Sequence, residues 1–356
     1  MSKPPAAPPR RPERAATAHD VARRAGVSQS AVSRAFTPGA SVSAATRARV
    51  EEAAAALGYR PNLIARSLIT RRSSIVGVAV AYLDNPFYAA LLDALSVALE
   101  ATGHRVLLFT ARPGANTDPI LEEVLRYRVD ALVLASVGLS SRFARECRQA
   151  GVPVVLVNRR SEDDGAACIT GDNAGGAALI ARFLAAGGHR RPAFLAGLED
   201  ASTSREREAG FAAELAALGF GPPLRAVGHY DFGRAEAATR ALLSTAAPPD
   251  ALFCANDHMG FAALGVARRE FGGLPVSVVG FDDAGPAGWA ALGLTTYSQP
   301  LRPMVDRVVT ALMRQMVAPD EAPLRETVPG ALLLRGSARE PHDGVSLQDG
   351  ERVWRG

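Results

Sequence analysis

The stretch "DVARRAGVSQSAVSRAF", residues 20–36, has the pattern of two short helices joined by a tight turn. Gly26 can adopt the left-handed backbone conformation that ends a helix, and Ser28 can cap the N-terminus of the next one. Val27, between them, can fill the gap where the two helices meet. The stretch therefore predicts a helix-turn-helix, whose second helix can lie in the major groove of DNA.

The second helix, expected over residues 29–36, divides into an apolar and a polar face. Val32 and Ala35 are expected to face inward, which leaves Gln29, Ser30 and Arg34 on the outer face. Gln and Arg are the side chains that can form paired hydrogen bonds to adenine and guanine edges. The alternative is a purely structural helical hairpin whose polar face meets only solvent.

Capping signals place two more helix boundaries in this region. Thr17 can begin the first helix with Asp20 as its capping-box partner. Ser43 can begin a third helix, and Gly58 can end it. Residues 17–60 are therefore expected to form a small all-α domain, here called the headpiece.

Charge is distributed unevenly along the chain. The net charge is only +4, but residues 1–72 hold 13 Lys/Arg against 4 Asp/Glu, and the remaining residues hold 27 against 32. This segregation indicates that the first segment binds a polyanion. Residues 1–16, rich in Pro and Arg, are expected to be a disordered leader without the apolar region of a secretory signal.

The stretch "YRPNLIARSLITRRSS", residues 59–74, has two interpretations. Pro61 blocks continuation of a helix, and Asn62 could cap a new short helix over 63–69. Such a helix would carry Leu68 between arginines and could insert an apolar wedge into a minor groove. On these residues alone, a hinge over 61–72 and an ordinary linker both remain open.

From residue 73 the pattern changes to strands that alternate with helices. Apolar runs occur as "SIVGVAVAYL", "RVLLF", "VDALVLASV" and "VPVVLVNRR", and a second series follows as "RPAFLAGL", "ALFCAND" and "VSVVGFDD". Continuous apolar strands between helices are typical of parallel sheets covered on both faces. We expect two doubly wound α/β lobes over residues 73–340, followed by a tail over 341–356 without a coiled-coil repeat.

Polar side chains follow several of these strands. Asn85, Asn158, Arg159, Asn256 and Asp282 all come at or just after strand ends. Ligands of such sheets bind beyond the carboxyl ends of the strands, and Asp, Asn and Arg suit a ligand with neighbouring hydroxyls. The alternative for Asn85, Asn256 and Asp283 is that each caps the following helix.

Aromatic residues close to these positions could cover the apolar face of a sugar or base. They could equally belong to the core or to an interface. The candidates are Phe87, Tyr88, Tyr230 and Trp289.

Residues 17–70 resemble the DNA-binding headpiece of the LacI family of bacterial regulators. The matching stretches are "DVARRAGVSQSAVSRAF", "VSAATRARVEEAAAALGY" and "RPNLIARSL", and weaker correspondence continues to about residue 335. The resemblance implies base reading by the second helix, a supporting operator contact at Tyr59 and a minor-groove wedge at Leu68. The expected DNA-contacting residues are Ser28, Gln29, Ser30, Ser33, Arg34, Tyr59, Asn62 and Leu68.

The resemblance also implies a core similar to periplasmic sugar-binding proteins, with an effector between the lobes. By matching positions it adds Thr203 and Arg207 and supports Asp282, while Tyr230 and Phe232 compete for one aromatic position. The expected effector-contacting residues are Phe87, Tyr88, Asn158, Arg159, Thr203, Arg207, Tyr230, Asn256, Asp282 and Trp289. Arg159 and Arg207 allow a sugar acid or a phosphorylated sugar, and a neutral sugar is also compatible.

Other functional classes lack their sequence signatures. There is no phosphate-binding loop and no G-x-S-x-G elbow, the six histidines show no metal spacing, and the three cysteines lie far apart. A membrane span, a cofactor and a metal are therefore not expected. We expect a cytoplasmic transcriptional repressor that binds a palindromic double-stranded operator as a homodimer, under control of a sugar or sugar derivative.

Overall fold

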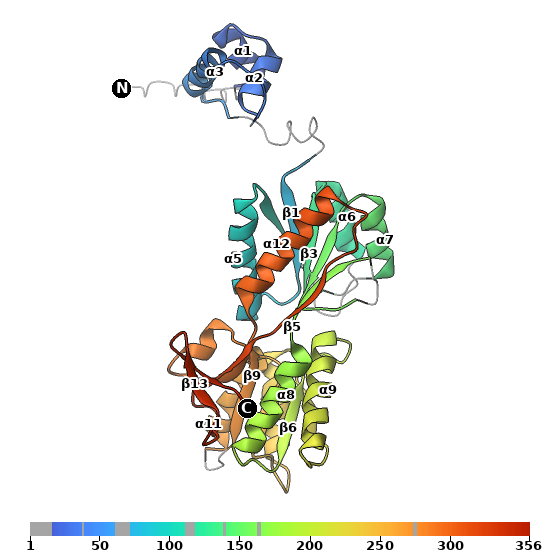
Figure 1. The fold of residues 1–356 in the computed structure, drawn as a ribbon, viewed down its shortest axis with the longest axis vertical. Helices are drawn as coiled ribbons and strands as arrows, with labels where there is room; N and C mark the ends of the chain where they lie inside the picture. The colour runs from blue at the N-terminus through green and yellow to red at the C-terminus, as the bar shows by residue number, and fades with distance from the viewer. Residues whose placement is uncertain are drawn as a thin grey trace, which may run out of the picture. The chain divides into compact units, whose positions relative to one another are not determined.

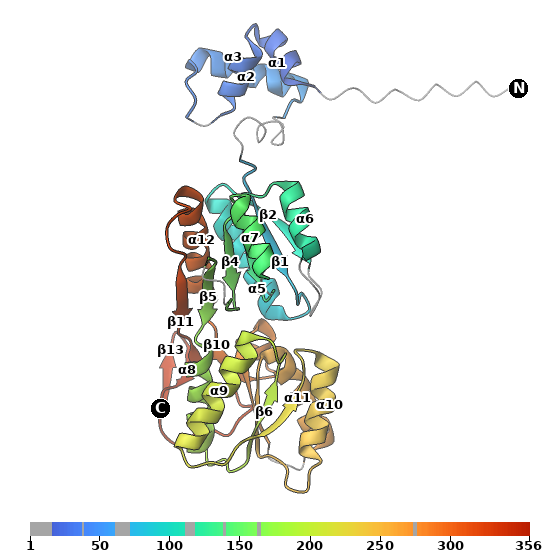
Figure 2. The ribbon, with the colours of Figure 1, turned by 90° about the vertical axis from the view of Figure 1, so that its right-hand side faces the viewer.

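The computed structural model describes residues 16–37, 39–60, 72–110, 118–137, 140–161, 165–272 and 276–356. The chain divides into two compact units, Met1–Ser73 and Ser74–Gly356, whose elements are drawn in Figures 1 and 2. Within the described residues, no helix combines the length and the apolar composition needed to cross a membrane.

The headpiece folds as the sequence predicts. Thr17 forms a reciprocal capping box with Asp20, Gly26 has a φ of 62°, and the Ser28 hydroxyl accepts a hydrogen bond from the Ala31 amide at 3.2 Å. These local bonds satisfy backbone groups that helix ends leave unpaired. The three helices are α1 (Ala18–Ala25), α2 (Gln29–Ala35) and α3 (Ala44–Leu57), which Ser43 caps and Gly58 ends.

The first lobe of the second unit contains a six-stranded, wholly parallel sheet in the order β11-β5-β4-β3-β1-β2. Helices α5 and α12 cover one face, and α6 and α7 cover the other (Figure 1). The strands are β1 (Ile75–Val80), β2 (Arg105–Thr110), β3 (Ala131–Ala135), β4 (Val154–Val157), β5 (Ala167–Gly171) and β11 (Arg325–Val328). The helices are α5 (Pro86–Ala101), α6 (Asp118–Tyr127), α7 (Ser141–Gln149) and α12 (Leu301–Val317).

Burial on both faces explains why these strands are continuously apolar. Within β3, Val133 and Ala135 belong to the cluster that contains α5, whereas Leu132 and Leu134 belong to the cluster beneath α6 and α7. Successive side chains of a strand point to opposite faces, so a sheet covered twice needs apolar residues at every position.

The second lobe contains an eight-stranded sheet in the order β13-β14-β12-β10-β9-β8-β6-β7, in which β12, β13 and β14 run antiparallel to their neighbours. Helices α8 and α9 lie on one face, and α10 and α11 on the other (Figure 2). The strands are β6 (Pro192–Ala196), β7 (Leu224–Val227), β8 (Ala251–Cys254), β9 (Ser277–Asp282), β10 (Thr295–Ser298), β12 (Ala331–Leu333), β13 (Val345–Gln348) and β14 (Glu351–Trp354). The helices are α8 (Asn173–Ala186), α9 (Ser202–Ala217), α10 (Phe232–Leu243) and α11 (Asp257–Glu270), with a 3₁₀ turn at Gly285–Gly288.

The chain passes between the lobes three times, from β5 to α8, from β10 to α12 and from β11 to β12. The prediction of two α/β lobes with parallel sheets is confirmed by this topology. Because the carboxyl ends of the strands carry the crossings, the loops that follow β1, β3, β4, β8 and β9 can meet between the lobes.

The expectation of a tail over residues 341–356 is wrong. These residues contribute a β-hairpin, β13 and β14, that extends the sheet of the second lobe. Asp349 and Gly350 turn with φ values of 52° and 82°, as a two-residue hairpin turn requires. Trp354 is buried with its ring centroid 5.6 Å from that of Phe183. The Asp-Gly pair between "VSLQ" and "ERVW" was the local signal for this hairpin.

Candidate functional site

The outer face of α2 presents the residues that the sequence assigned to base reading. Val32 and Ala35 are almost wholly buried, so the opposite side of this helix faces solvent. The Ser28 and Ser30 hydroxyls lie 2.9 Å apart at the start of the helix. The side chains exposed there are Ser28, Gln29, Ser30, Ser33 and Arg34.

The other expected DNA-contacting residues, Tyr59, Asn62 and Leu68, come after α3 in the chain. Tyr59 follows the end of α3 and packs against the headpiece core, with its ring centroid 6.0 Å from that of Phe36. This position stabilises the three-helix fold, and the operator contact of Tyr59 stays a prediction. Asn62 and Leu68 lie outside the described residues.

A pocket in the second unit lies between its two lobes. Its first-lobe wall comes from the start of α5 and the loops after β1, β3 and β4, and its second-lobe wall from α9, the end of β9 and the loops after β7 and β8. This is the place where ligands of doubly wound sheets bind. The pocket is lined by Tyr82, Asn85, Tyr88, Ser136, Asn158, Thr203, Arg207, Tyr230, Asn256 and Asp282.

Arg207, on α9, is the most completely enclosed charged side chain of the pocket. Its Nε donates to Asn173 Oδ1 at 2.9 Å, and its Nη1 donates to the carbonyl oxygen of Ala255. Its Nη2 lies 3.4 Å from Asp282 Oδ1. A buried guanidinium is tolerated only with such a counter-charge and hydrogen bonds.

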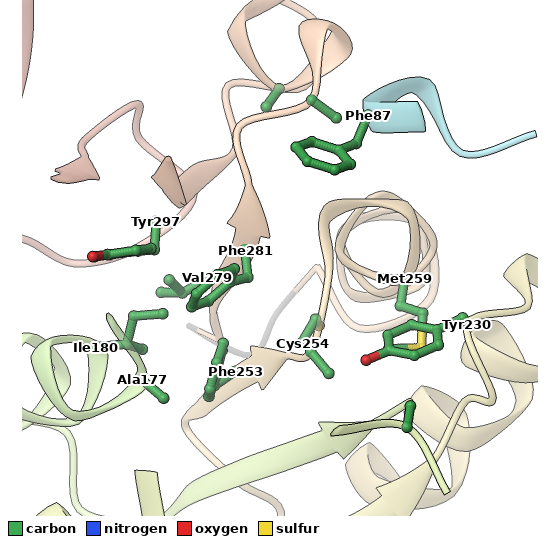
Figure 3. Close-up of a cluster of buried hydrophobic side chains, with 14 of the residues drawn as sticks. Phe87, Ala177, Ile180, Tyr230, Phe253, Cys254, Met259, Val279, Phe281 and Tyr297 are labelled. Carbon is green, nitrogen blue, oxygen red and sulfur yellow. The ribbon is translucent and has the colours of Figure 1, made fainter. Parts of the chain in front are cut away.

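The aromatic base under Arg207 fixes the plane of its guanidinium. The guanidinium carbon lies 3.7 Å from the centroid of the Phe281 ring, a cation–π arrangement. Phe281 itself packs against Phe253 and Tyr297, with centroids 6.4 and 4.8 Å away. Figure 3 shows these three rings in one cluster of the second lobe. The Phe281 ring and the hydrogen bonds of Nε and Nη1 therefore fix the orientation of the Arg207 guanidinium.

Asp282, at the end of β9, supplies the acidic group of the pocket. Burial raises the pKa of its carboxyl to about 6, although Arg207 and hydrogen bonds from Gln299 and Asn85 lower it. Gln299 Nε2 donates to Asp282 Oδ1 at 2.6 Å. The Asp282 backbone has a φ of 127°, a conformation that L-residues rarely adopt and that often marks a functional site.

Three tyrosines, Tyr82, Tyr88 and Tyr230, line the pocket. Asn158 Nδ2 donates to Tyr88 Oη at 3.3 Å, and the hydroxyls of Thr203 and Tyr230 lie 3.0 Å apart. The Tyr82 and Tyr230 rings meet edge to face with centroids 6.2 Å apart. These rings place both hydroxyls and apolar faces around one small volume, which suits a ligand with both characters.

Three expected contacts are not among the lining side chains. Phe87 is 3% exposed and packs in the core against Tyr88, and Trp289 is 62% exposed on the surface. Figure 3 shows Phe87 on its own helix, away from Tyr230. Arg159 lies close enough for its charge to lower the pKa of Tyr82, which burial raises to about 12. The side chains that line the pocket therefore do not include Phe87, Arg159 or Trp289.

Comparison with known proteins identifies the family. Residues 73–283 match the family described as "Periplasmic binding proteins and sugar binding domain of LacI family", and residues 17–62 match "Bacterial regulatory proteins, lacI family". The chain belongs to the LacI family. It is 33% identical to the HTH-type transcriptional regulator CelR of Thermobifida fusca, over 89% of this chain and 96% of that protein. It is also 33% identical to GalS of Salmonella typhimurium, over 85% and 90%.

Solved structures of this family share the fold. A transcriptional regulator CelR–cellobiose complex matches with a TM-score of 0.68 and 32% identity, covering 91% of this chain and all of that one. The lac repressor dimer bound to operator and the anti-inducer ONPF matches with a TM-score of 0.81 and 27% identity, covering 91% and 99%. The family's two parts therefore extend over nearly all of this chain.

Sequence reasoning missed two pocket residues of this LacI-family chain, Tyr82 and Ser136, and left Asn85 out of the expected effector contacts. Tyr82 and Ser136 follow β1 and β3 as Asn158 follows β4, so their positions after strands were the available signal. Asn85 and Asn256 both cap helices and line the pocket, since their Oδ1 atoms accept from the Phe87 and Met259 amides. The two interpretations of these asparagines were thus compatible.

The structure decides between the alternatives that the sequence left open for Asp283 and Phe232. Asp283 pairs with Arg335 at 2.7 Å and does not cap a helix. Phe232 is 43% exposed, so Tyr230 alone takes the aromatic position in the pocket. Among the described residues, no group of His, Cys, Asp and Glu side chains is arranged to hold a metal ion.

Proposed function

We propose that this protein is a dimeric transcriptional repressor whose operator binding is controlled by a neutral sugar in the inter-lobe pocket. The observation that carries the ligand class is a set of unpartnered buried polar atoms. Among the described side chains that line the pocket, Asn158 Oδ1 and Arg207 Nη2 have no hydrogen-bond partner, although Nη2 lies 3.4 Å from Asp282 Oδ1.

These two atoms are complementary. The amide oxygen accepts hydrogen bonds, whereas the arginine nitrogen donates them. A buried polar atom without a partner is costly, so such atoms indicate a missing group. A hydroxyl both donates and accepts, and a ring with several hydroxyls can therefore satisfy both atoms.

The state of Arg207 favours a neutral ligand over an anionic one. Its charge is matched by Asp282, and its Nε and Nη1 already donate to protein oxygens. An anionic ligand at this guanidinium would place a second negative charge beside the buried Asp282 carboxylate, whereas a neutral hydroxyl would not. The CelR relative in complex with cellobiose supports the same class.

A thermal-shift screen tests the ligand class. The panel contains cellobiose, galactose and ribose, with their sugar acids and phosphates as matched anionic probes. A neutral sugar at 100 times its Kd should stabilise the core by about 2.7 kcal/mol. If only anionic members shifted the transition, or if none of the panel did, the neutral-sugar assignment would fail.

The DNA-binding half of the proposal rests on α2 and on the operator-bound relative. One helix of this length reads few base pairs, so two headpieces on a palindromic double-stranded site double the sequence that is read. We infer that the protein acts in the cytoplasm, where that DNA lies, and that it has no catalytic activity.

Replacing Arg34 by alanine should remove discrimination at one symmetric position in each half-site. The expected loss is about 1–3 kcal/mol for each missing pair of base contacts. Selection sequencing of bound operators measures it, with Arg49→Ala on the exposed side of α3 as a control that keeps the preference. An unchanged preference in Arg34→Ala would assign this arginine to a phosphate or structural contact.

Replacing Leu68 by alanine tests the hinge, which lies outside the described residues. If Leu68 is a minor-groove wedge, specific affinity and DNA bending should both fall, while salt-sensitive non-specific binding should survive. Affinity measurements at two salt concentrations and a bending assay check this. Normal affinity with a normal bend would restore the linker interpretation.

A further inference from the structure

A continuous chain of polar contacts leads from Arg207 to Arg160 in the first lobe. Asn173, the first residue of α8, accepts from Arg207 Nε through Oδ1 and donates through Nδ2 to Glu206 Oε2 at 2.8 Å. Glu206 Oε1 lies 3.0 Å from Arg160 Nε. Each group in this chain therefore fixes the orientation of the next.

Arg160 belongs to the other lobe. It follows β4, and its Nη2 donates to Thr327 Oγ1 on β11 at 2.7 Å and to Thr170 Oγ1 on β5 at 3.4 Å. Its backbone amide donates to Ser202 Oγ at the start of α9, at 3.0 Å. Arg160 thus contacts β5 and β11, the two first-lobe strands from which the chain crosses to the second lobe. It also contacts α9, the helix that carries Arg207.

The chemistry of Asn173 makes the chain directional. An amide side chain offers one acceptor and one donor group, and here the acceptor faces Arg207 while the donor faces Glu206. Because Asn173 is almost completely buried, water cannot replace either partner. If Glu206 moves, the amide must rotate or lose a bond, and the Arg207 guanidinium loses its lateral support.

We propose that Arg160, Glu206 and Asn173 are positioning residues that couple the relative placement of the two lobes to the orientation of Arg207. A rotation of one lobe against the other changes the contact between Arg160 and Glu206. Asn173 passes this change to the Arg207 Nε. The pocket then offers Arg207 in its binding orientation only when the lobes are correctly placed.

This role differs from a stabilising one. The Arg160 and Glu206 side chains are 42% and 28% exposed, and ion pairs of that exposure contribute little to stability. Removing the pair should hardly change the melting temperature. It should nevertheless change the hydrogen bond at Arg207, which lies in the other lobe from Arg160.

The test uses the full-length protein without a ligand, so its result is independent of the sugar assignment. The Nε–H resonance of Arg207 in ¹⁵N-arginine-labelled protein is assigned by its loss in Arg207→Lys. Its exchange rate with water is then measured in Arg160→Ala, Glu206→Gln and Asn173→Ala. The matched control is Glu208→Gln, on the same helix as Glu206, which removes a 2.6 Å pair with Arg225 on β7.

We expect exchange about tenfold faster in all three variants, the change that corresponds to one lost charge-assisted hydrogen bond. Glu208→Gln should leave the rate unchanged, and the melting temperature of Arg160→Ala should stay within a few degrees of the parent. If Asn173→Ala alone accelerated exchange, Asn173 would be a local contact and the relay would be refuted. An equal effect of Glu208→Gln would refute it as well.

Discussion

Replacing Asp282 by alanine is expected to lower the free energy of unfolding of the core by about 3–5 kcal/mol, because it leaves a buried charge without its partner. The Arg207 guanidinium is only 2% exposed, and it would lose the carboxylate that lies 3.4 Å from its Nη2. Gln299 Nε2 would also lose its 2.6 Å acceptor. Denaturant unfolding measures this loss.

The same variant should lose its response to the effector, since the ligand's hydroxyls would be buried without an acceptor. Operator binding without ligand should stay near normal, because the headpiece is a separate compact unit. If the ligand is an inducer, the variant should repress in its presence, and if it is a co-repressor, the variant should fail to repress.

Two controls separate these effects. Asp282→Asn keeps an oxygen acceptor but removes the counter-charge of Arg207, and Asp283→Asn removes a carboxylate outside the pocket that pairs with Arg335. Operator binding is titrated with and without the sugar found in the thermal-shift screen. A normally stable Asp282→Ala protein that responds at the usual ligand concentration would exclude Asp282 from the site.

The core is also expected to lose stability as the pH rises from about 4 to 8, because of Asp257. This carboxyl is wholly buried, and it accepts from Thr296 Oγ1 at 2.6 Å and from the Ala284 amide at 2.8 Å. Burial, together with the nearby charge of Asp282, raises its pKa from 3.8 to about 8.

The direction follows from proton binding. Between these two pKa values the folded protein holds a proton on Asp257 that the unfolded chain has released, so acidification favours the folded state. Each such proton changes the free energy of unfolding by about 1.4 kcal/mol per pH unit. Asp282, with its pKa raised to about 6, adds to the slope in the lower half of the range.

Urea unfolding at several pH values measures this slope in the parent and in Asp257→Asn. The difference in stability between them should change by about 1.4 kcal/mol per pH unit, with the parent losing stability relative to the variant as the pH rises. Asp306→Asn, at an exposed position of α12, should run parallel to the parent. Parallel curves for Asp257→Asn would mean that this carboxyl is ionised throughout the range.

The sequence by itself determined the headpiece and the architecture of the core. The boundaries of the headpiece helices depend on bonds between residues no more than about four positions apart, such as Thr17 with Asp20 and Ser28 with Ala31. The two-lobed core followed from strand composition, since sheets buried on both faces require continuous apolar strands. Both signals are local and can be recognised along the chain.

Only the tertiary structure decided which side chains form the pocket. Tyr82, Ser136 and Tyr230 meet there although they come from segments far apart in the chain, whereas Trp289 faces solvent. Which side chain at a strand end points into the space between the lobes depends on the angle at which each loop leaves its sheet. That angle is set by packing against residues distant in sequence, and local patterns do not contain it.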